Sequence, residues 1–350
     1  MMAEHDLDAR EREVLRSVIR AHVATGAPVA SKSLVARSLD LSPATIRAIM
    51  AELEERGLLV QPHTSAGRVP TDAGYRMYVD RLMDPARVNA SLAQAIDDAM
   101  ARSRREIPDL LEEASRQLSR FSHQVGVVLA PELRRIVVEH LEFVRLDPRR
   151  VVAVLVDRAG LVHNRILDAE GLSQEELDRV GRRLTDEYGG RTLTEMRADL
   201  LARMREDRLA YDRLVSAGLE LGRQVAEAGD RAGGGVFVEG ASNLVGGPDF
   251  PDVERSKALL RTLEEKSRLV DLLGRMLEGG GVQIVIGREN PLADLTDVSL
   301  VASTYGAGER ILGTVGIVGP TRMEYARAVA LVEHLAGVLT RLLTSGESGR

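Results

Sequence analysis

The residues of this sequence that are best suited to a chemical task lie in one short stretch, "SPATIRA", at positions 42–48. Arg47 carries a planar guanidinium, which can donate two parallel hydrogen bonds to guanine O6 and N7 or to a phosphate. Thr45 offers a hydroxyl and a methyl group, while Ala44 and Ala48 are small enough to let a bulky partner approach closely. Such residues near the start of a helix are typical of a helix that enters the major groove of DNA.

A second group of polar residues follows in "HTSAGR", at positions 63–68. Hydroxyl groups, the backbone N–H groups around a glycine and a terminal arginine are all common ligands of the DNA backbone. We therefore expect both stretches to contact nucleic acid. The candidate DNA-binding residues are Lys32, Ser42, Ala44, Thr45, Arg47, His63, Thr64, Ser65, Gly67 and Arg68.

The surrounding sequence predicts the elements that hold these residues. Asp8 with Glu11 predicts a capping box at the start of a first helix, and Ser31 is the expected cap of a second, short helix. Ser42 and Pro43 predict the start of a third helix. Its expected end is Gly57, and its apolar stripe is Ile46, Ile49, Met50 and Leu53.

The segment that follows predicts a hairpin and a closing helix. Leu58–Val60 and Arg68–Val69 are expected to pair as strands, and Thr71 is expected to cap a helix. That helix would bury Tyr75, Val79, Leu82 and Met83. Three helices followed by a hairpin predict a winged helix-turn-helix, which serves most often in DNA binding and sometimes in protein docking.

Composition limits the remaining choices. The chain has 350 residues, which is enough for two or three domains, and its 44% hydrophobic and 29% charged residues are ordinary for a globular protein. Its net charge of −6 argues against a uniformly basic nucleic-acid binder; residues 1–88 carry 12 basic and 12 acidic residues. There is no cysteine, which excludes disulfides and thiolate metal sites. The polar N-terminus has no export signal and no apolar run is long enough to span a bilayer, so we expect a cytoplasmic protein without a membrane partner.

No pattern in the sequence predicts an enzyme. The glycine-rich segments "GGGVFVEG" and "YGAGERILG" are not followed by the Lys-Ser/Thr of a phosphate-binding loop. The histidines show no ligand pairing and no His-Glu-x-x-His motif. We therefore expect no catalytic residue, no metal and no cofactor.

Beyond residue 88, the order of expected elements predicts an α+β fold. A polar helical stretch at about 90–121, which we expect to act as a connector, precedes strands in "QVGVVLA", "IVVEHLEFVRL", "VVAVLVD" and "LVHNRIL". A helical block over 173–228 separates these from later strands in "GGGVFVEG", "VQIVIG", "VSLVASTY" and "ILGTVGIVG", and helices are expected near 252–278 and 321–343. Strands on both sides of a helical block indicate a domain that contains an insertion.

Three long motifs are specific enough to compare with known families: "QPHTSAGRVPTDAGYR", "VFVEGASNLV" and "SLVASTYGAGERILGTVGIVG". In this order they resemble the heat-inducible transcription repressor family, HrcA, and the resemblance covers nearly the whole chain. It implies a winged helix-turn-helix (1–88), then a GAF-like domain in two parts (89–169 and 251–350) with an inserted dimerisation domain (170–250).

The resemblance also implies a function. Members of the family are negative regulators of class I heat-shock operons; they bind an inverted-repeat operator (CIRCE) as homodimers, with the chaperonin as modulator. One departure is that Ala48 stands where relatives carry an asparagine, which shifts base reading toward Thr45 and Arg47. The alternative is a regulator of other genes whose GAF-like domain senses a small molecule, since such domains often hold ligands.

Overall fold

The computed structural model describes residues 7–35, 41–63, 66–103, 107–130, 137–158, 162–169, 171–206, 218–225, 235–244, 250, 253–276, 281–307 and 310–345. The chain divides into two compact units. The first comprises Met1–Val128, Val236–Thr304 and Thr314–Gly337, and the second comprises Leu129–Gly235, Tyr305–Gly313 and Val338–Arg350. Helices and strands are mixed throughout, so the expected α+β class is confirmed.

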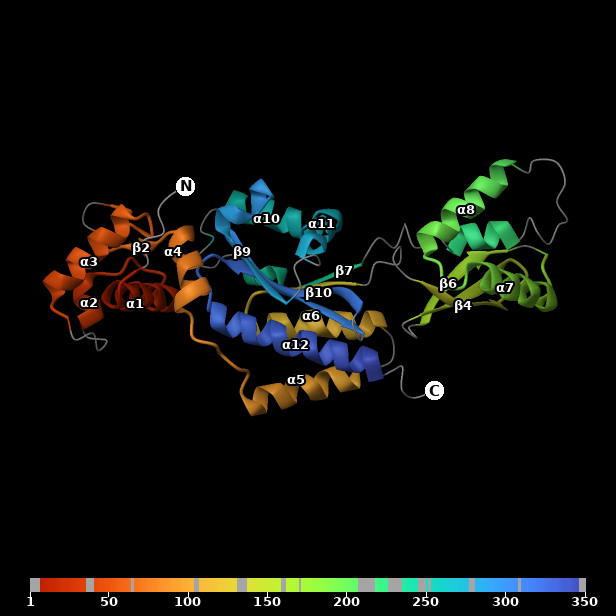
Figure 1. The fold of residues 1–350 in the computed structure, drawn as a ribbon, viewed down its shortest axis with the longest axis horizontal. Coiled ribbons are helices and arrows are strands. Elements are labelled where there is room, and N and C mark those ends of the chain that lie inside the picture. The colour runs from red at the N-terminus through yellow and green to blue at the C-terminus, as the bar shows by residue number, and fades with distance from the viewer. Residues whose placement is uncertain are drawn as a thin grey trace. The chain divides into compact units, whose positions relative to one another are not determined.

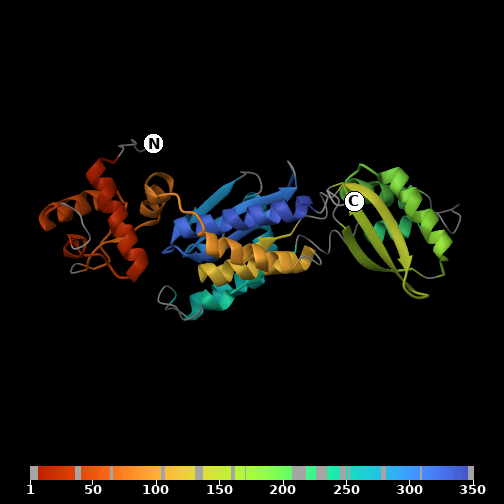
Figure 2. The ribbon, with the colours of Figure 1, turned by 90° about the horizontal axis from the view of Figure 1, so that it is seen from below.

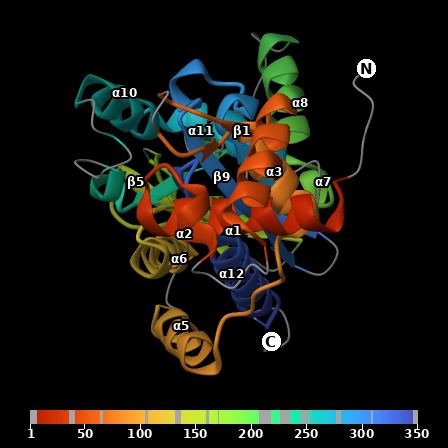
Figure 3. The same cartoon turned by 90° about the vertical axis from the view of Figure 1, so that its left-hand side faces the viewer.

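The first unit begins with three helices and a hairpin, which together we call the N-terminal segment (residues 7–82). Helix α1 (Ala9–Thr25) starts with the predicted capping box, because Asp8 accepts from the Glu11 backbone while the Glu11 carboxylate accepts from the Asp8 backbone. Helix α2 (Ser31–Val35) includes the expected cap Ser31 as its first residue, and α3 (Pro43–Glu55) follows. The short strands β1 (Leu59–Val60) and β2 (Val69–Pro70) pair antiparallel. In Figure 3 the helices α1, α2 and α3 are seen at the front of the molecule.

The N-terminal segment ends in a helix whose geometry changes part-way. Thr71 caps α4 (Asp72–Met77), as predicted, and the chain continues as a π-helical turn, η1 (Tyr78–Leu82). The expectation that Val79 and Met83 are buried is wrong: Tyr78 is buried instead, whereas Val79 is half-buried and Met83 is half-buried just after the helical turn ends. The wider turn adds about one residue per turn, and this shifts the buried stripe away from the 3.6-residue period.

The core of the first unit is a five-stranded sheet. Its strand order is β7-β3-β10-β9-β8, from β3 (Val125–Leu129), β7 (Val236–Glu239), β8 (Val282–Ile286), β9 (Val298–Ala307) and β10 (Arg310–Pro320). Helices α6 (Ile107–Ser122) and α12 (Tyr325–Ser345) lie on one side of this sheet, with α5 (Ala90–Arg102) outside α12 (Figures 1 and 2). Helices α10 (Val253–Glu264) and α11 (Lys266–Met276) lie on the other side (Figure 1). The polar stretch 90–121 is therefore two helices packed in the core domain.

The second unit contains a separate antiparallel sheet, β4-β5-β6, from β4 (Val138–Arg145), β5 (Arg150–Asp157) and β6 (Val162–Asp168). Helices α7 (Gln174–Tyr188) and α8 (Leu193–Glu206) bury an apolar core with this sheet, and Leu221 and Val225 of the helical stretch 218–225 join it. The expected boundary at residue 170 therefore falls inside this unit. The sequences of β4, β5 and β6 do not reveal which sheet these strands join. The sheet is decided by the strands with which they pair, and those partners lie elsewhere in the sequence.

Candidate nucleic-acid interface

Residues next to the start of helix α3 fix where the helix begins, and one face of its first turn is exposed. The Ser42 hydroxyl accepts from the Thr45 backbone N–H at 3.1 Å, and Pro43 occupies the first helical position. The residues of the predicted stripe are buried, and α3 packs against α1 and α2. The opposite face is exposed and carries Ala44, Arg47 and Ala48.

The two hydroxyl groups of this turn bond to each other. Ser42 Oγ lies 2.8 Å from Thr45 Oγ1, so both side chains serve partly to close the start of the helix. By contrast, no hydrogen bond or ion pair involves the Arg47 side chain within the part of the chain that the structure describes. Arg47 is thus the cation on α3 with both reach and open bonding capacity. The helix N-terminus adds partial positive charge at the same place.

Lys32 lies on α2, the helix before α3, and is exposed. A lysine there is a flexible point charge, suited to a phosphate and not to base reading. His63 is exposed at the tip of the hairpin, where its carbonyl accepts from the Ala66 backbone N–H at 2.8 Å. Thr64 and Ser65 lie outside the described residues.

Gly67 allows close approach of two backbone segments. Val29 and Arg68 exchange two backbone hydrogen bonds, of 2.8 and 2.9 Å. A Cβ on Gly67 would lie 2.3 Å from the Val29 carbonyl oxygen, so any larger residue would force these segments apart. Gly67 therefore attaches the hairpin to the turn before α2.

The Arg68 guanidinium has a partner inside the N-terminal segment. Its Nε and Nη2 donate to Glu54 Oε2 at 3.1 and 2.9 Å, and the other oxygen of Glu54 accepts from the Gln61 backbone N–H at 3.0 Å. The Arg68 and Glu54 side chains are only 18% and 31% exposed. One carboxylate thus joins α3 to both strands of the hairpin. The guanidinium lies where the hairpin loop meets the paired strands, although the sequence placed it at a phosphate.

Glu54 is the functional residue that sequence reasoning missed. In the sequence Glu54 looks no different from its acidic neighbours Glu52 and Glu55. The signal that could have found it is the presence of a single arginine at the return of the hairpin, which needs a partner when it is half-buried.

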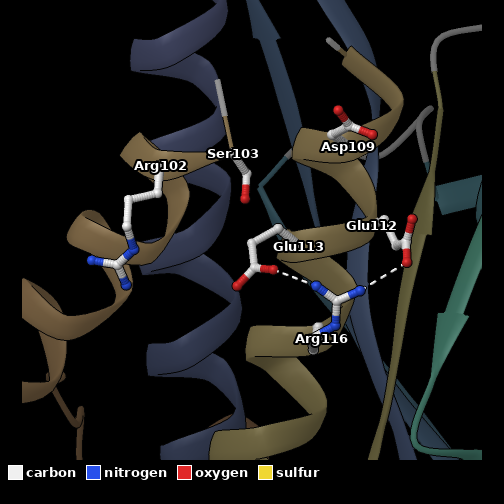
Figure 4. Close-up of a pocket in the computed structure, with 6 residues that line it drawn as sticks. All are labelled: Arg102, Ser103, Asp109, Glu112, Glu113 and Arg116. Carbon is white, nitrogen blue, oxygen red and sulfur yellow. Dashed lines mark hydrogen bonds and ion pairs between the residues drawn. The ribbon is translucent and has the colours of Figure 1, made fainter. Parts of the chain in front are cut away.

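One pocket of the first unit shows few of the features of a small-molecule site. A pocket of about 390 Å³ at α5 and α6 is lined by Arg102, Ser103, Asp109, Glu112, Glu113 and Arg116 (Figure 4). Arg116 points between Glu112 and Glu113, with bonds of 2.7 and 2.5 Å. The lining is charged, whereas ligand pockets are mostly apolar. Among the described residues, no cluster of three or more His, Asp or Glu could hold a metal, and no helix is long and apolar enough to cross a membrane.

Comparison with known proteins decides the family. The family model of the HrcA protein C-terminal domain matches residues 108–329, more than half of the chain. The heat-inducible transcription repressor HrcA of Geobacter sulfurreducens is 41% identical over 340 residues, covering 97% of this chain and 98% of that protein. The chain belongs to the HrcA family. Its resemblance to that family is therefore confirmed.

Two further matches extend this result. The HrcA repressor of Syntrophobacter fumaroxidans is 39% identical over 341 residues, covering 97% of this chain and 98% of that protein. A crystal structure described as a hypothetical protein shares the fold, with a TM-score of 0.66 at 23% identity, covering 97% of this chain and all of that one. As an HrcA chain, the protein is a transcription repressor of the heat-inducible type, which implies that it binds DNA.

Proposed function

We propose that the chain represses class I heat-shock operons in the cytoplasm by binding, as a homodimer, an inverted-repeat operator of the CIRCE type. The observation that carries this proposal is the exposed first turn of α3 in a member of the HrcA family, where the Arg47 side chain has no bonding partner among the described residues. In this proposal the N-terminal segment acts as a winged helix-turn-helix, and the five-stranded sheet with its helices is the GAF-like domain.

The candidate residues then have specific tasks, except Thr45, whose hydroxyl bonds Ser42 at the start of α3. Arg47 reads guanine, while Ala44 and Ala48 let the helix approach the base edges. Ser42 and Lys32 contact phosphates beside the groove. The tip at His63, with Thr64 and Ser65, follows the adjacent backbone, and Gly67 and Arg68 position that tip.

The dimer is supported by an exposed face of the sheet in the second unit, which carries two groups of apolar residues on either side of the row Glu142, Val154 and Asn164. In β5, Val151, Ala153 and Leu155 point into the core, so the alternate residues form the other face of the sheet. There Val144, Val152 and Ile166 stand in register across the three strands, and Val156 pairs with Val162 in a second row. The exposed fractions of Val144, Ile166 and Val162 are 43%, 61% and 42%. We propose that a second copy covers this face, because an inverted repeat requires a two-fold axis.

The chaperonin is the proposed modulator, on a physical argument about folding. In the five-stranded sheet β3 lies between β7 and β10, which begin at residues 236 and 310. These pairings must close long loops before they stabilise anything, so folding is slow and apolar strands stay exposed longer. A repressor that reaches its active fold only with assistance loses activity when unfolded proteins occupy the chaperonin.

Footprinting of the purified full-length chain on DNA upstream of chaperonin genes tests the proposal. We expect protection of an inverted repeat, with symmetric contacts in two major grooves. Protection of a single, asymmetric site, or none at any chaperone promoter, would contradict it. Adding chaperonin and ATP should raise the fraction of molecules that bind excess operator.

A further inference from the structure

Helix α4 is joined to the core of the first unit by a charged contact that the sequence did not predict. Arg76 donates from Nε to Glu289 Oε1 at 2.9 Å and from Nη2 to Glu289 Oε2 at 2.5 Å. Its Nη2 also donates to the Ile284 carbonyl at 2.6 Å. The Asp72 carboxylate accepts from the Arg288 backbone N–H at 3.0 Å. We call Asp72, Arg76, Arg288 and Glu289 the α4–β8 junction.

The junction is geometrically specific. A guanidinium that bonds both oxygens of one carboxylate is fixed in distance and in plane. Arg76 is also held by Asp80 on its own segment, at 3.2 Å. The hydrogen bonds to Glu289 raise the pKa of Arg76. Burial acts to raise the pKa of Glu289, but the bonds from Arg76 and the Ile286 N–H outweigh it and lower that pKa.

Backbone shape adapts the core to this contact. Gly287 has φ +51°, and a Cβ there would lie 2.5 Å from the Asp72 carboxylate. The turn that presents Arg288 and Glu289 (η4, Gly287–Glu289) can therefore approach α4 only because residue 287 is glycine.

Two more contacts join the same parts at other points. Arg322 Nη1 donates to the Val23 carbonyl at 2.8 Å, near the end of α1. The rings of Tyr75 and Tyr325 are 5.8 Å apart, and the Tyr325 hydroxyl bonds Ser299 of β9 at 2.8 Å. Contacts from both α1 and α4 resist rotation of the N-terminal segment better than a single contact would.

None of these contacts uses the exposed turn of α3, where Ala44 and Arg47 stay open. We propose that the α4–β8 junction is a positioning device, with Arg76 and Glu289 as its main residues, that sets the spacing at which a dimer reads its two half-sites. This inference rests on the proposed function.

The length of the linker after η1 determines how far the N-terminal segment could move if the junction were open. Residues 83–89 form neither helix nor strand. A flexible linker of that length has an end-to-end distance of about 14 Å. Successive base pairs are ~3.4 Å apart, so a segment held by the linker alone could reach half-sites displaced by roughly four base pairs. With the junction closed, that freedom is lost.

The test measures affinity against half-site spacing. Full-length protein is titrated with operators whose spacer is natural or changed by one or two base pairs, and with a single half-site. Two base pairs rotate one half-site by about 70°, so we expect the parent to lose roughly 100-fold, the gain from engaging both half-sites. Glu289→Gln keeps an oxygen for the Ile286 N–H but loses the charge; its loss should be several-fold smaller than the parent's, with single-half-site affinity unchanged.

Two further variants complete the design. Arg76→Ala removes every bond of the guanidinium and should flatten the spacing profile at least as much. Arg268→Gln is the matched control, because it breaks an ion pair with Asp294 in the same core without contacting the N-terminal segment. Circular dichroism confirms that each variant is folded.

The outcomes distinguish a failure of the proposed function from a failure of the role proposed for the α4–β8 junction. A parent that binds no inverted repeat overturns the proposed function, and this inference with it. A parent that discriminates spacing, with parental profiles in both Glu289→Gln and Arg76→Ala, overturns the inference alone. A control variant that flattens the profile equally would also overturn it, because the effect would not belong to the junction.

Discussion

Replacing Glu54 by glutamine distinguishes two readings of Arg68 by the sign of the effect. If Arg68 contacts phosphate, removing a nearby negative charge frees it and strengthens DNA binding. If Arg68 instead holds the hairpin through Glu54, the substitution loosens the hairpin and operator affinity stays at or below the parental value. The structure supports the second reading, because three hydrogen bonds converge on the Glu54 carboxylate.

The magnitude follows from burial and from what glutamine retains. Exposed ion pairs contribute ~0.2–1 kcal/mol, and breaking a fully buried pair costs ~3–5 kcal/mol. Arg68 and Glu54 lie between these limits, at 18% and 31% exposure. Glutamine keeps one neutral acceptor, so we expect a loss of about 1–2 kcal/mol in hairpin stability. This corresponds to a roughly 5- to 30-fold rise in the open fraction.

Amide hydrogen exchange followed by mass spectrometry measures that fraction in the full-length chain. Peptides covering 59–70 should exchange faster by this factor in Glu54→Gln, while peptides from α1 stay unchanged. Glu52→Gln is the matched control: it removes the same charge from α3, and its exposed side chain makes no hydrogen bond or ion pair among the described residues. Parental exchange in Glu54→Gln, together with tighter operator binding than in Glu52→Gln, would refute the reasoning.

Three other predictions test separate parts of the molecule. Arg47→Ala should weaken operator binding by about 1–3 kcal/mol per half-site in gel shifts, lose less on scrambled DNA and leave the melting temperature unchanged. Ile166→Lys should dissociate the dimer in sedimentation, whereas Asp186→Lys on the exposed side of α7 should not; a dimeric Ile166→Lys would exclude the proposed face. Glu289→Gln should reduce unfolding free energy by less than about 1 kcal/mol. In urea titrations this difference should be constant above pH 4.5 and shrink below it, because a carboxyl whose pKa is lowered on folding loses its stabilising charge as the pH falls.

What could be predicted from sequence was local. The Asp8–Glu11 capping box, the Ser42 cap and the buried stripe of α3 depend on residues within one or two turns, and the structure has all of them. Most strands were found as apolar runs for the same reason. The Val79 error was local too, but a π-turn has no reliable sequence signal.

The contacts that could not be predicted are between residues that are far apart in sequence and that only the fold brings together. Arg68 and Glu54 are 14 residues apart, and Arg76 and Glu289 are 213 apart. An arginine near an expected DNA surface looks the same in sequence whether it meets phosphate or a distant carboxylate. The assignment of β4–β6 to a second sheet was hidden for a similar reason, since each strand carries no mark of its partner.

These pairings bear on how the repressor obtains affinity. Within the described residues of the N-terminal segment, acidic partners hold Arg16, Arg20, Arg56, Arg68 and Arg76. Arginines committed in this way stabilise and orient the fold, and they leave few cations to neutralise phosphates. Since each phosphate contact contributes a fixed part of the salt dependence, a single N-terminal segment should bind DNA weakly and without much sequence-independent attraction. Under the proposed function, tight binding then comes from engaging two half-sites at once. We therefore expect dimerisation and the orientation of each segment on its core to matter as much as the base contacts proposed for Arg47.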